Sequence, residues 1–145
     1  MKRLLCTLAL AALAALAAAP LRAASDDEVA ARKLALEIAG AFSNDGFKLR
    51  DGNWCGKFEP GKPGLIQVNL YAGNQYWFTL GATDAAKKVA VTVFDETGKP
   101  MTTDPYADVS VAAAGFAPTA SGPYYIRVEL TEGKPAAFCL IYSYR

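Results

Sequence analysis

The stretch that decides the fold is Leu65-Ile66-Gln67-Val68-Asn69-Leu70-Tyr71, in which apolar and polar side chains alternate. Neighbouring residues of a strand point to opposite faces, so Ile66, Val68 and Leu70 share one face and the two amide residues between them share the other. This pattern is typical of a strand with one face on a core and the other in water. We therefore expect a strand here.

The same alternation recurs toward the C-terminus, in segments separated by turns rich in Gly, Pro, Asn or Asp. About six or seven strands without helical patterns between them indicate a mainly β protein, an antiparallel sandwich of two sheets. Besides the first stretch, strands are expected at Gln75 to Leu80, Lys88 to Phe94, around Val109 and Val111, Tyr124 to Leu130, and Ala137 to Tyr144.

A helical period precedes the strands. Leu34, Ile38 and Phe42 recur every four residues with alanines beside them, which indicates one N-terminal amphipathic α-helix. The capping box Ser25-Asp26-Asp27-Glu28 predicts its start, and Asn44-Asp45-Gly46 predicts its end. We expect this helix to pack on the flank of the domain; a partner-binding or membrane-lying helix is the alternative.

The first 23 residues resemble a signal peptide. A basic start, Met1-Lys2-Arg3, precedes the uncharged run Leu4 to Ala19, and a small residue, Ala23, marks the expected cleavage site. The alternative is an uncleaved anchor, but 16 residues extend about 24 Å as a helix, short of a hydrocarbon core of about 30 Å. We therefore expect a periplasmic or secreted protein with no stable membrane insertion after processing.

The predicted organisation is a signal peptide at 1–23, an N-terminal amphipathic helix at 24–46 and a β-sandwich domain at 47–145. Removal of the signal peptide takes the basic side chains from 15 to 12, against 14 acidic ones, which gives no electrostatic footprint for nucleic acid. The chain has no histidine, which excludes Ser-His triads, Cys-His dyads and His-ligated zinc. We expect no cofactor and no metal.

Two cysteines follow the predicted cleavage site, Cys55 and Cys139. An even pair in an oxidising compartment most simply forms one disulfide, which would join the first and last strands. A redox-active pair is the alternative, but these cysteines lack the close Cys-x-x-Cys spacing.

The candidates for acid-base chemistry are Asp95, Glu96, Asp104 and Asp108. A pair of carboxylates would suit a small hydrolase, which is the alternative function. We expect these residues to lie in turns, where such side chains are solvated or bonded to the local backbone. The spacing of Asp104 and Asp108 does not fit an EF-hand loop, and the protein is expected not to be an enzyme.

Three runs together resemble the bacterial pre-peptidase C-terminal domain. They are Tyr71 to Leu80, Val89 to Lys99 with its Asp-x-x-Gly turn, and Ser121 to Val128 with its Ser-Gly-x-Tyr-Tyr start. The resemblance covers roughly residues 58–144. It implies a jelly-roll-like sandwich that serves secreted proteins as a non-catalytic accessory or binding module.

Both tryptophans are candidate binding residues. Trp77 alternates with Tyr76, Phe78 and Leu80 and so points away from the core face, and Trp54 lies in a polar, Gly-flanked stretch. Exposed aromatic rings on a sandwich can stack on sugar rings or anchor a protein. The alternative is that both rings cover the core edge, the helix or the disulfide. The sequence thus predicts an exported binding module for an envelope protein or glycan, with the partner's identity left open.

Overall fold

The computed structural model describes residues 23–43 and 45–145. The predicted signal peptide up to residue 22, and Asn44 of the predicted helix stop, lie outside the described residues. The elements, in chain order, are α2 (Asp26–Ser43), β1 (Lys48–Leu49), β2 (Trp54–Lys57), β3 (Gly64–Leu70), β4 (Tyr76–Ala82), β5 (Ala86–Phe94), β6 (Asp104–Asp108), β7 (Val111–Phe116), β8 (Gly122–Gly133) and β9 (Ala137–Tyr144).

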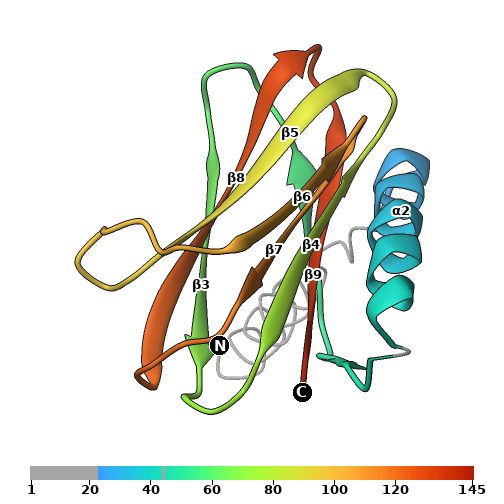
Figure 1. Ribbon diagram of the computed structural model, residues 1–145. Coiled ribbons are helices and arrows are strands. Elements are labelled where there is room, and N and C mark those ends of the chain that lie inside the picture. The colour runs from blue at the N-terminus through green and yellow to red at the C-terminus, as the bar shows by residue number, and fades with distance from the viewer. Residues whose placement is uncertain (1–22, 44) are drawn as a thin grey trace, which may run out of the picture.

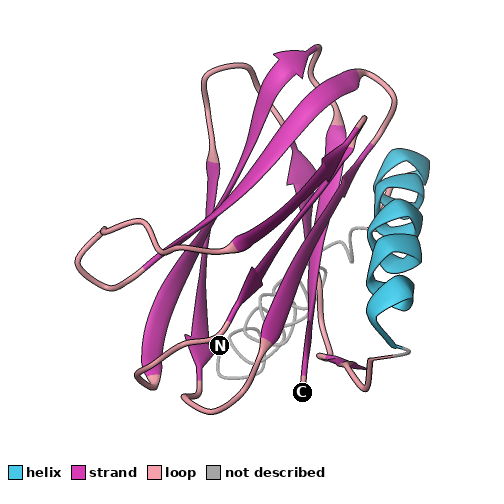
Figure 2. Ribbon diagram, viewed as in Figure 1, coloured by secondary structure: helices cyan, strands magenta, loops and turns pink. Residues whose placement is uncertain are grey.

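The strands form two antiparallel sheets that face each other (Figure 1). The large sheet has the order β9-β4-β7-β6, with β1 and β2 both paired to β9, and the small sheet has the order β3-β8-β5. Figure 2 shows that strands dominate the molecule and that one helix stands beside them. The predicted β-sandwich preceded by one helix is therefore confirmed.

The core lies between the sheets, where the predicted alternation places the apolar side chains. Phe78 and Leu80 from the large sheet, and Ile126 and Val128 from the small one, are fully buried. Removing such side chains from water supplies most of the favourable free energy of folding.

Helix α2 packs on the outer face of the large sheet, against β4 and β9 (Figure 1). Its contact stripe includes the buried residues Ala31 and Ala35, which confirms flank packing. Gly81 on β4 lies directly beneath, because a Cβ there would stand 2.4 Å from the carbonyl oxygen of Ala31. The helix backbone therefore approaches the sheet more closely than any side chain at position 81 would allow.

The capping box of the helix is confirmed. The Glu28 N–H donates to Ser25 Oγ, and the Ser25 N–H donates to Glu28 Oε2, each at 3.2 Å. Among the described residues, no helix has both the length and the apolar character needed to cross a membrane.

Two local expectations were wrong. Asp104 and Asp108 were expected in turns, but they are the first and last residues of strand β6. This strand pairs with β7 at the edge of the large sheet. Val109 lies in the connection, and the short strand predicted around it is Val111–Phe116. The alanines of β7 are buried on both faces, so no apolar-polar alternation marks this strand.

Candidate functional site

The disulfide joins strands β2 and β9 at the edge of the large sheet. Cys55 on β2 and Cys139 on β9 are directly opposite in the antiparallel ladder and are bonded to each other, as predicted. Trp54, the next residue on β2, is opposite Leu140, a fully buried core residue. Because opposite residues of a ladder point to the same face, Trp54 lies on the inner side of the sheet.

A cleft of about 460 Å³ lies where the sandwich stays open, between β3 of the small sheet and the β2–β9 edge of the large one. We call it the aromatic cleft. Five aromatic side chains line it: Trp54, Tyr71, Tyr76, Tyr142 and Tyr144.

Four of the five rings of the aromatic cleft, those of Trp54, Tyr76, Tyr142 and Tyr144, contact one another. Trp54 stacks on Tyr142, with ring centroids 5.7 Å apart and planes 14° from parallel. The ring centroids of Tyr142 and Tyr76 are 6.2 Å apart. The Tyr76 hydroxyl accepts hydrogen bonds from the Tyr71 N–H at 2.9 Å and from Asn74 Nδ2 at 3.1 Å. These bonds tie the turn after β3 to β4, so the floor of the cleft is preorganised.

Polar groups surround these rings. Arg50, Asp51, Gln67 and Asn69 line the cleft with exposed side chains. Within the described part of the chain, the Trp54 indole N–H and the hydroxyls of Tyr142 and Tyr144 have no hydrogen-bonding partner. The cleft therefore offers both donors and acceptors to a ligand.

Trp77 lies elsewhere. It points to the outer face of the large sheet, as alternation predicted, but its ring stacks on Phe42 of α2, with centroids 4.2 Å apart and planes 8° from parallel. A Cβ on Gly115 of β7 would stand 2.9 Å from Trp77 Cζ2, so the indole lies close over that glycine. The structure thus places Trp54 in the aromatic cleft and Trp77 in the helix contact, where Trp77 borders a separate hollow of about 510 Å³, and it does not bring the two together.

The tyrosines of the cleft were not among the predicted site residues. A signal was present, because Leu140, Tyr142 and Tyr144 alternate along one face of β9 and that face changes from aliphatic to aromatic. Inward tyrosines at the end of a strand indicate a place where the core meets water.

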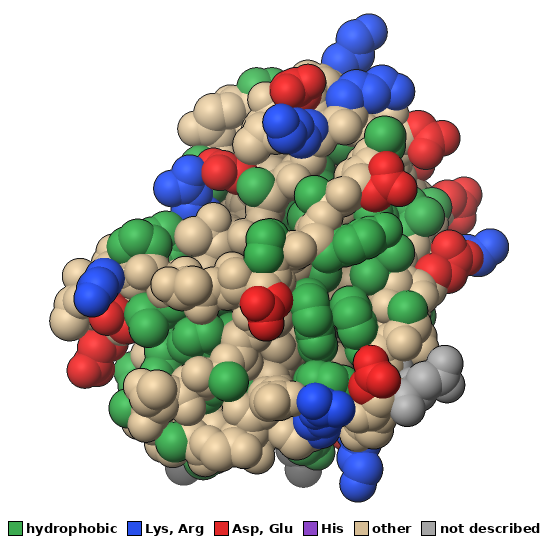
Figure 3. Space-filling view, in the orientation of Figure 1, with side chains coloured by type: hydrophobic (Ala, Val, Ile, Leu, Met, Phe, Trp, Pro, Cys, Tyr) green, Lys and Arg blue, Asp and Glu red, His purple; other side chains and the backbone are tan. Residues whose placement is uncertain are grey.

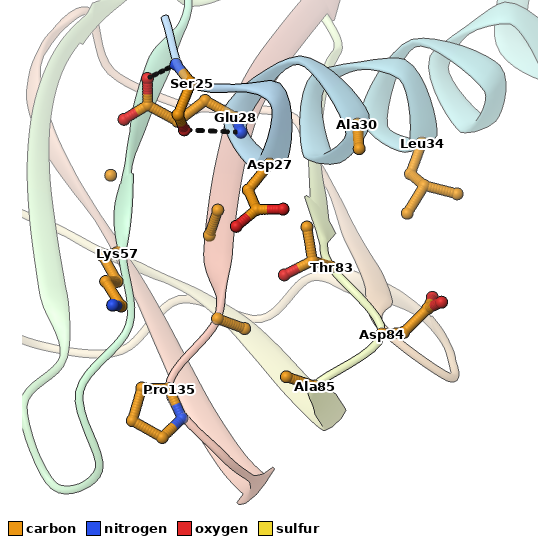
Figure 4. A pocket seen from close by; sticks show the side chains of 13 residues that line it. Ser25, Asp27, Glu28, Ala30, Leu34, Lys57, Thr83, Asp84, Ala85 and Pro135 are labelled. Carbon is orange, nitrogen blue, oxygen red and sulfur yellow. Dashed lines mark hydrogen bonds between the residues drawn. The ribbon is translucent and has the colours of Figure 1, made fainter.

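A second hollow, of about 580 Å³, lies at the start of α2 (Figure 4). Lys57, Asp27 and Asp84 contribute charges there, whereas the Glu28 side chain is turned to Ser25 in the helix cap. Most of its other lining residues are small, and none is aromatic. Unlike the aromatic cleft, it offers a ligand no aromatic ring to stack on.

The candidate carboxylates are dispersed. Asp95 Oδ1 accepts hydrogen bonds from the Thr97 hydroxyl at 2.7 Å and from the Lys99 N–H at 3.0 Å, and these bonds hold the pKa of Asp95 below its ordinary value. Asp104 and Asp108 are exposed on β6. Among the residues described, no group of three or more His, Cys, Asp or Glu side chains is placed to hold a metal ion.

On the face of the molecule seen in Figure 3, acidic and basic side chains are scattered singly, with hydrophobic side chains exposed between them. No protein-family model matches the chain, and no curated protein matches it in sequence.

Proposed function

We propose that this protein is an exported, non-catalytic binding module and that its aromatic cleft binds a glycan of the cell envelope. The observation that carries the proposal is the stacked pair of Trp54 and Tyr142 in an open cleft rimmed by exposed amide side chains. Wide, apolar ring faces combined with a few directed polar groups are the usual make-up of a ligand site.

The chemistry of a sugar ring suits this surface. Its C–H face packs on an aromatic ring, and its hydroxyls pair with side chains that both donate and accept. Gln67 and Asn69 supply amides at the β3 side of the cleft, and Arg50 and Asp51 supply one charge of each sign. The balance of charge favours a neutral or weakly charged saccharide.

The disulfide supports binding by preorganisation. Strand β2 has four residues, and it pairs only with β9 among the described strands. The bond beside Trp54 holds this short strand in place, so less conformational entropy is lost when a ligand settles on the ring. A disulfide is also compatible with the oxidising compartment that the predicted signal peptide implies.

The test is calorimetric titration of the purified protein with soluble probes: a peptidoglycan disaccharide and neutral glucan trisaccharides. For a probe that binds, Trp54→Ala should weaken binding about 30-fold or more, because a central aromatic contact contributes about 2 kcal/mol. Tyr106→Ala is the matched control, since Tyr106 is an exposed aromatic residue on β6, outside the cleft.

Two results would contradict the proposal. If Trp54→Ala binds a probe as tightly as the wild type, the site lies elsewhere. If none of the saccharides binds, the ligand is not a glycan of these classes.

A further inference from the structure

Edge strands expose unpaired backbone N–H and C=O groups, and proteins protect them against pairing with other chains. Three edges here are protected. Strand β5 carries Lys87 and Lys88, its register is interrupted at Lys88, and the Met101 N–H donates to the Val93 carbonyl at 2.8 Å along its outer side. Strand β6 has five residues, including Pro105 and two aspartates. On the remaining edge of the large sheet, β1 and β2 have only two and four residues.

Strand β3 has none of these protections. It has seven residues, contains no charge and no proline, and keeps an unbroken register with β8. Within the described part of the chain it pairs with no strand but β8. Leu65 on its outer face is 64% exposed. A long, uncharged edge with an unbroken register is a template for another strand.

We propose that β3 pairs antiparallel with β3 of a second copy of this chain and joins the two small sheets into one continuous sheet. This inference is independent of the proposed function, because it rests on the backbone edge of β3. Gln67 and Asn69 also line the aromatic cleft, so the junction runs along the rim of the cleft.

The side chains select one register. Centred on Val68, it places Leu65 opposite the partner's Tyr71 and Gln67 opposite the partner's Asn69. Leu65 and Tyr71 are each 64% exposed in the single chain, so the register pairs two exposed hydrophobic groups with each other and two amides with each other.

Neighbouring registers fit less well. A register centred on Gln67 would place Leu65 opposite the partner's Asn69. A register centred on Asn69 would place Gln67 opposite the partner's Tyr71. In both registers a hydrophobic side chain lies opposite an amide. The Tyr71 N–H already donates to the Tyr76 hydroxyl, so the new hydrogen-bonded ladder covers residues 66–70, and Leu65 meets the partner's Tyr71 just beyond each end of it. No like charges meet, since β3 has no charged residue.

Sedimentation velocity of the purified protein over a range of concentrations tests the proposal, and we expect a concentration-dependent dimer. Gln67→Lys should raise the dissociation constant at least tenfold, because the two copies would place lysines diagonally across the centre of the ladder. Gln67→Glu should do the same. An equal mixture of the two variants should restore the dimer, because opposite charges then meet, and its recovery shows that both variants are folded.

Ala107→Lys is the matched control. It adds the same charge to β6, the exposed edge of the other sheet, and should leave the dimer unchanged. A monomeric wild type at every concentration would overturn the proposal. So would a mixture of the Gln67 variants that stays monomeric, or an Ala107→Lys variant that dissociates as strongly as Gln67→Lys.

Discussion

The two tryptophans occupy comparable positions on the large sheet but have different surroundings. Both lie on strands of the large sheet and stack on a neighbouring ring, Phe42 for Trp77 and Tyr142 for Trp54. Trp77 is on the outer face, where α2 crosses the sheet, whereas Trp54 is on the inner face at an edge that borders an open cleft. The comparison shows that the alternation of side chains along a strand determines the face on which a residue lies. The elements packed over that face determine whether the residue is packed or open to a ligand.

The means of holding each ring also differ. Trp77 is held by close packing, between Phe42 and the backbone at Gly115. Trp54 is held by a covalent bond next to it on the chain, between Cys55 and Cys139. Each region should therefore respond to a different substitution.

Removal of the disulfide should have the largest effect, and it acts on the Trp54 region. The double variant Cys55→Ser/Cys139→Ser should lose about 4 kcal/mol of stability, because the bond closes a long loop that the unfolded chain otherwise leaves free. Urea unfolding without reductant measures this loss. Two labelled thiols in the denatured, unreduced wild type would show that the bond is absent and would remove the basis of the prediction.

Truncation of each tryptophan sharpens the comparison. Trp77→Ala should cost about 3 kcal/mol, because it leaves a cavity beneath α2. Both rings are half-buried and border a hollow, but Trp54→Ala should cost less, since the Trp77 ring also lies close over the backbone at Gly115. Denaturation curves of both variants beside the wild type provide the measurement. Trp77→Phe is the control, because it keeps a ring against Phe42 and should recover most of the loss; a larger cost at Trp54 would reverse our assignment of roles.

The smallest expected effect is a gain in stability from a substitution on β4 beneath the helix. Thr79 lies between Trp77 and Gly81 on β4, and its buried hydroxyl has no hydrogen-bond partner in the part of the chain described. Thr79→Val keeps the shape and removes the unpaired group, so it should stabilise the protein by up to about 1 kcal/mol. Thermal unfolding measures the shift.

Thr131→Val serves as the matched control for that change. Its hydroxyl donates to the Lys88 carbonyl at 3.0 Å, so the same substitution should be neutral or destabilising there. A lower midpoint for Thr79→Val than for the wild type would show that the Thr79 hydroxyl is satisfied in solution.

Much of this fold could be predicted from local patterns. The last strand was predicted at its observed bounds, Ala137–Tyr144, and the helix start followed from two capping side chains only three residues apart. Strand β6 was missed because acidic residues and a proline are typical of turns. At this sheet edge the same residues are tolerated, since one side of the strand needs no partner.

The site was less accessible to sequence reasoning. The aromatic cleft combines residues from Arg50 to Tyr144, and no short-range spacing connects them. Trp77 was a candidate because its strand turned it outward, but its contact with Phe42 depends on where α2 crosses the sheet. Such a crossing is decided by small residues on both sides, among them Gly81.

The disulfide has a mechanical consequence. A stretching force applied to the two ends of the chain passes from β2 to β9 through the Cys55–Cys139 bond and bypasses the loop between them. That loop spans 84 positions, or roughly 290 Å of extended chain. Under tension the chain outside the bond, including α2 and residues 140–144 of β9, would have to leave the large sheet before it lengthens, whereas the chain between the two cysteines would not be drawn out.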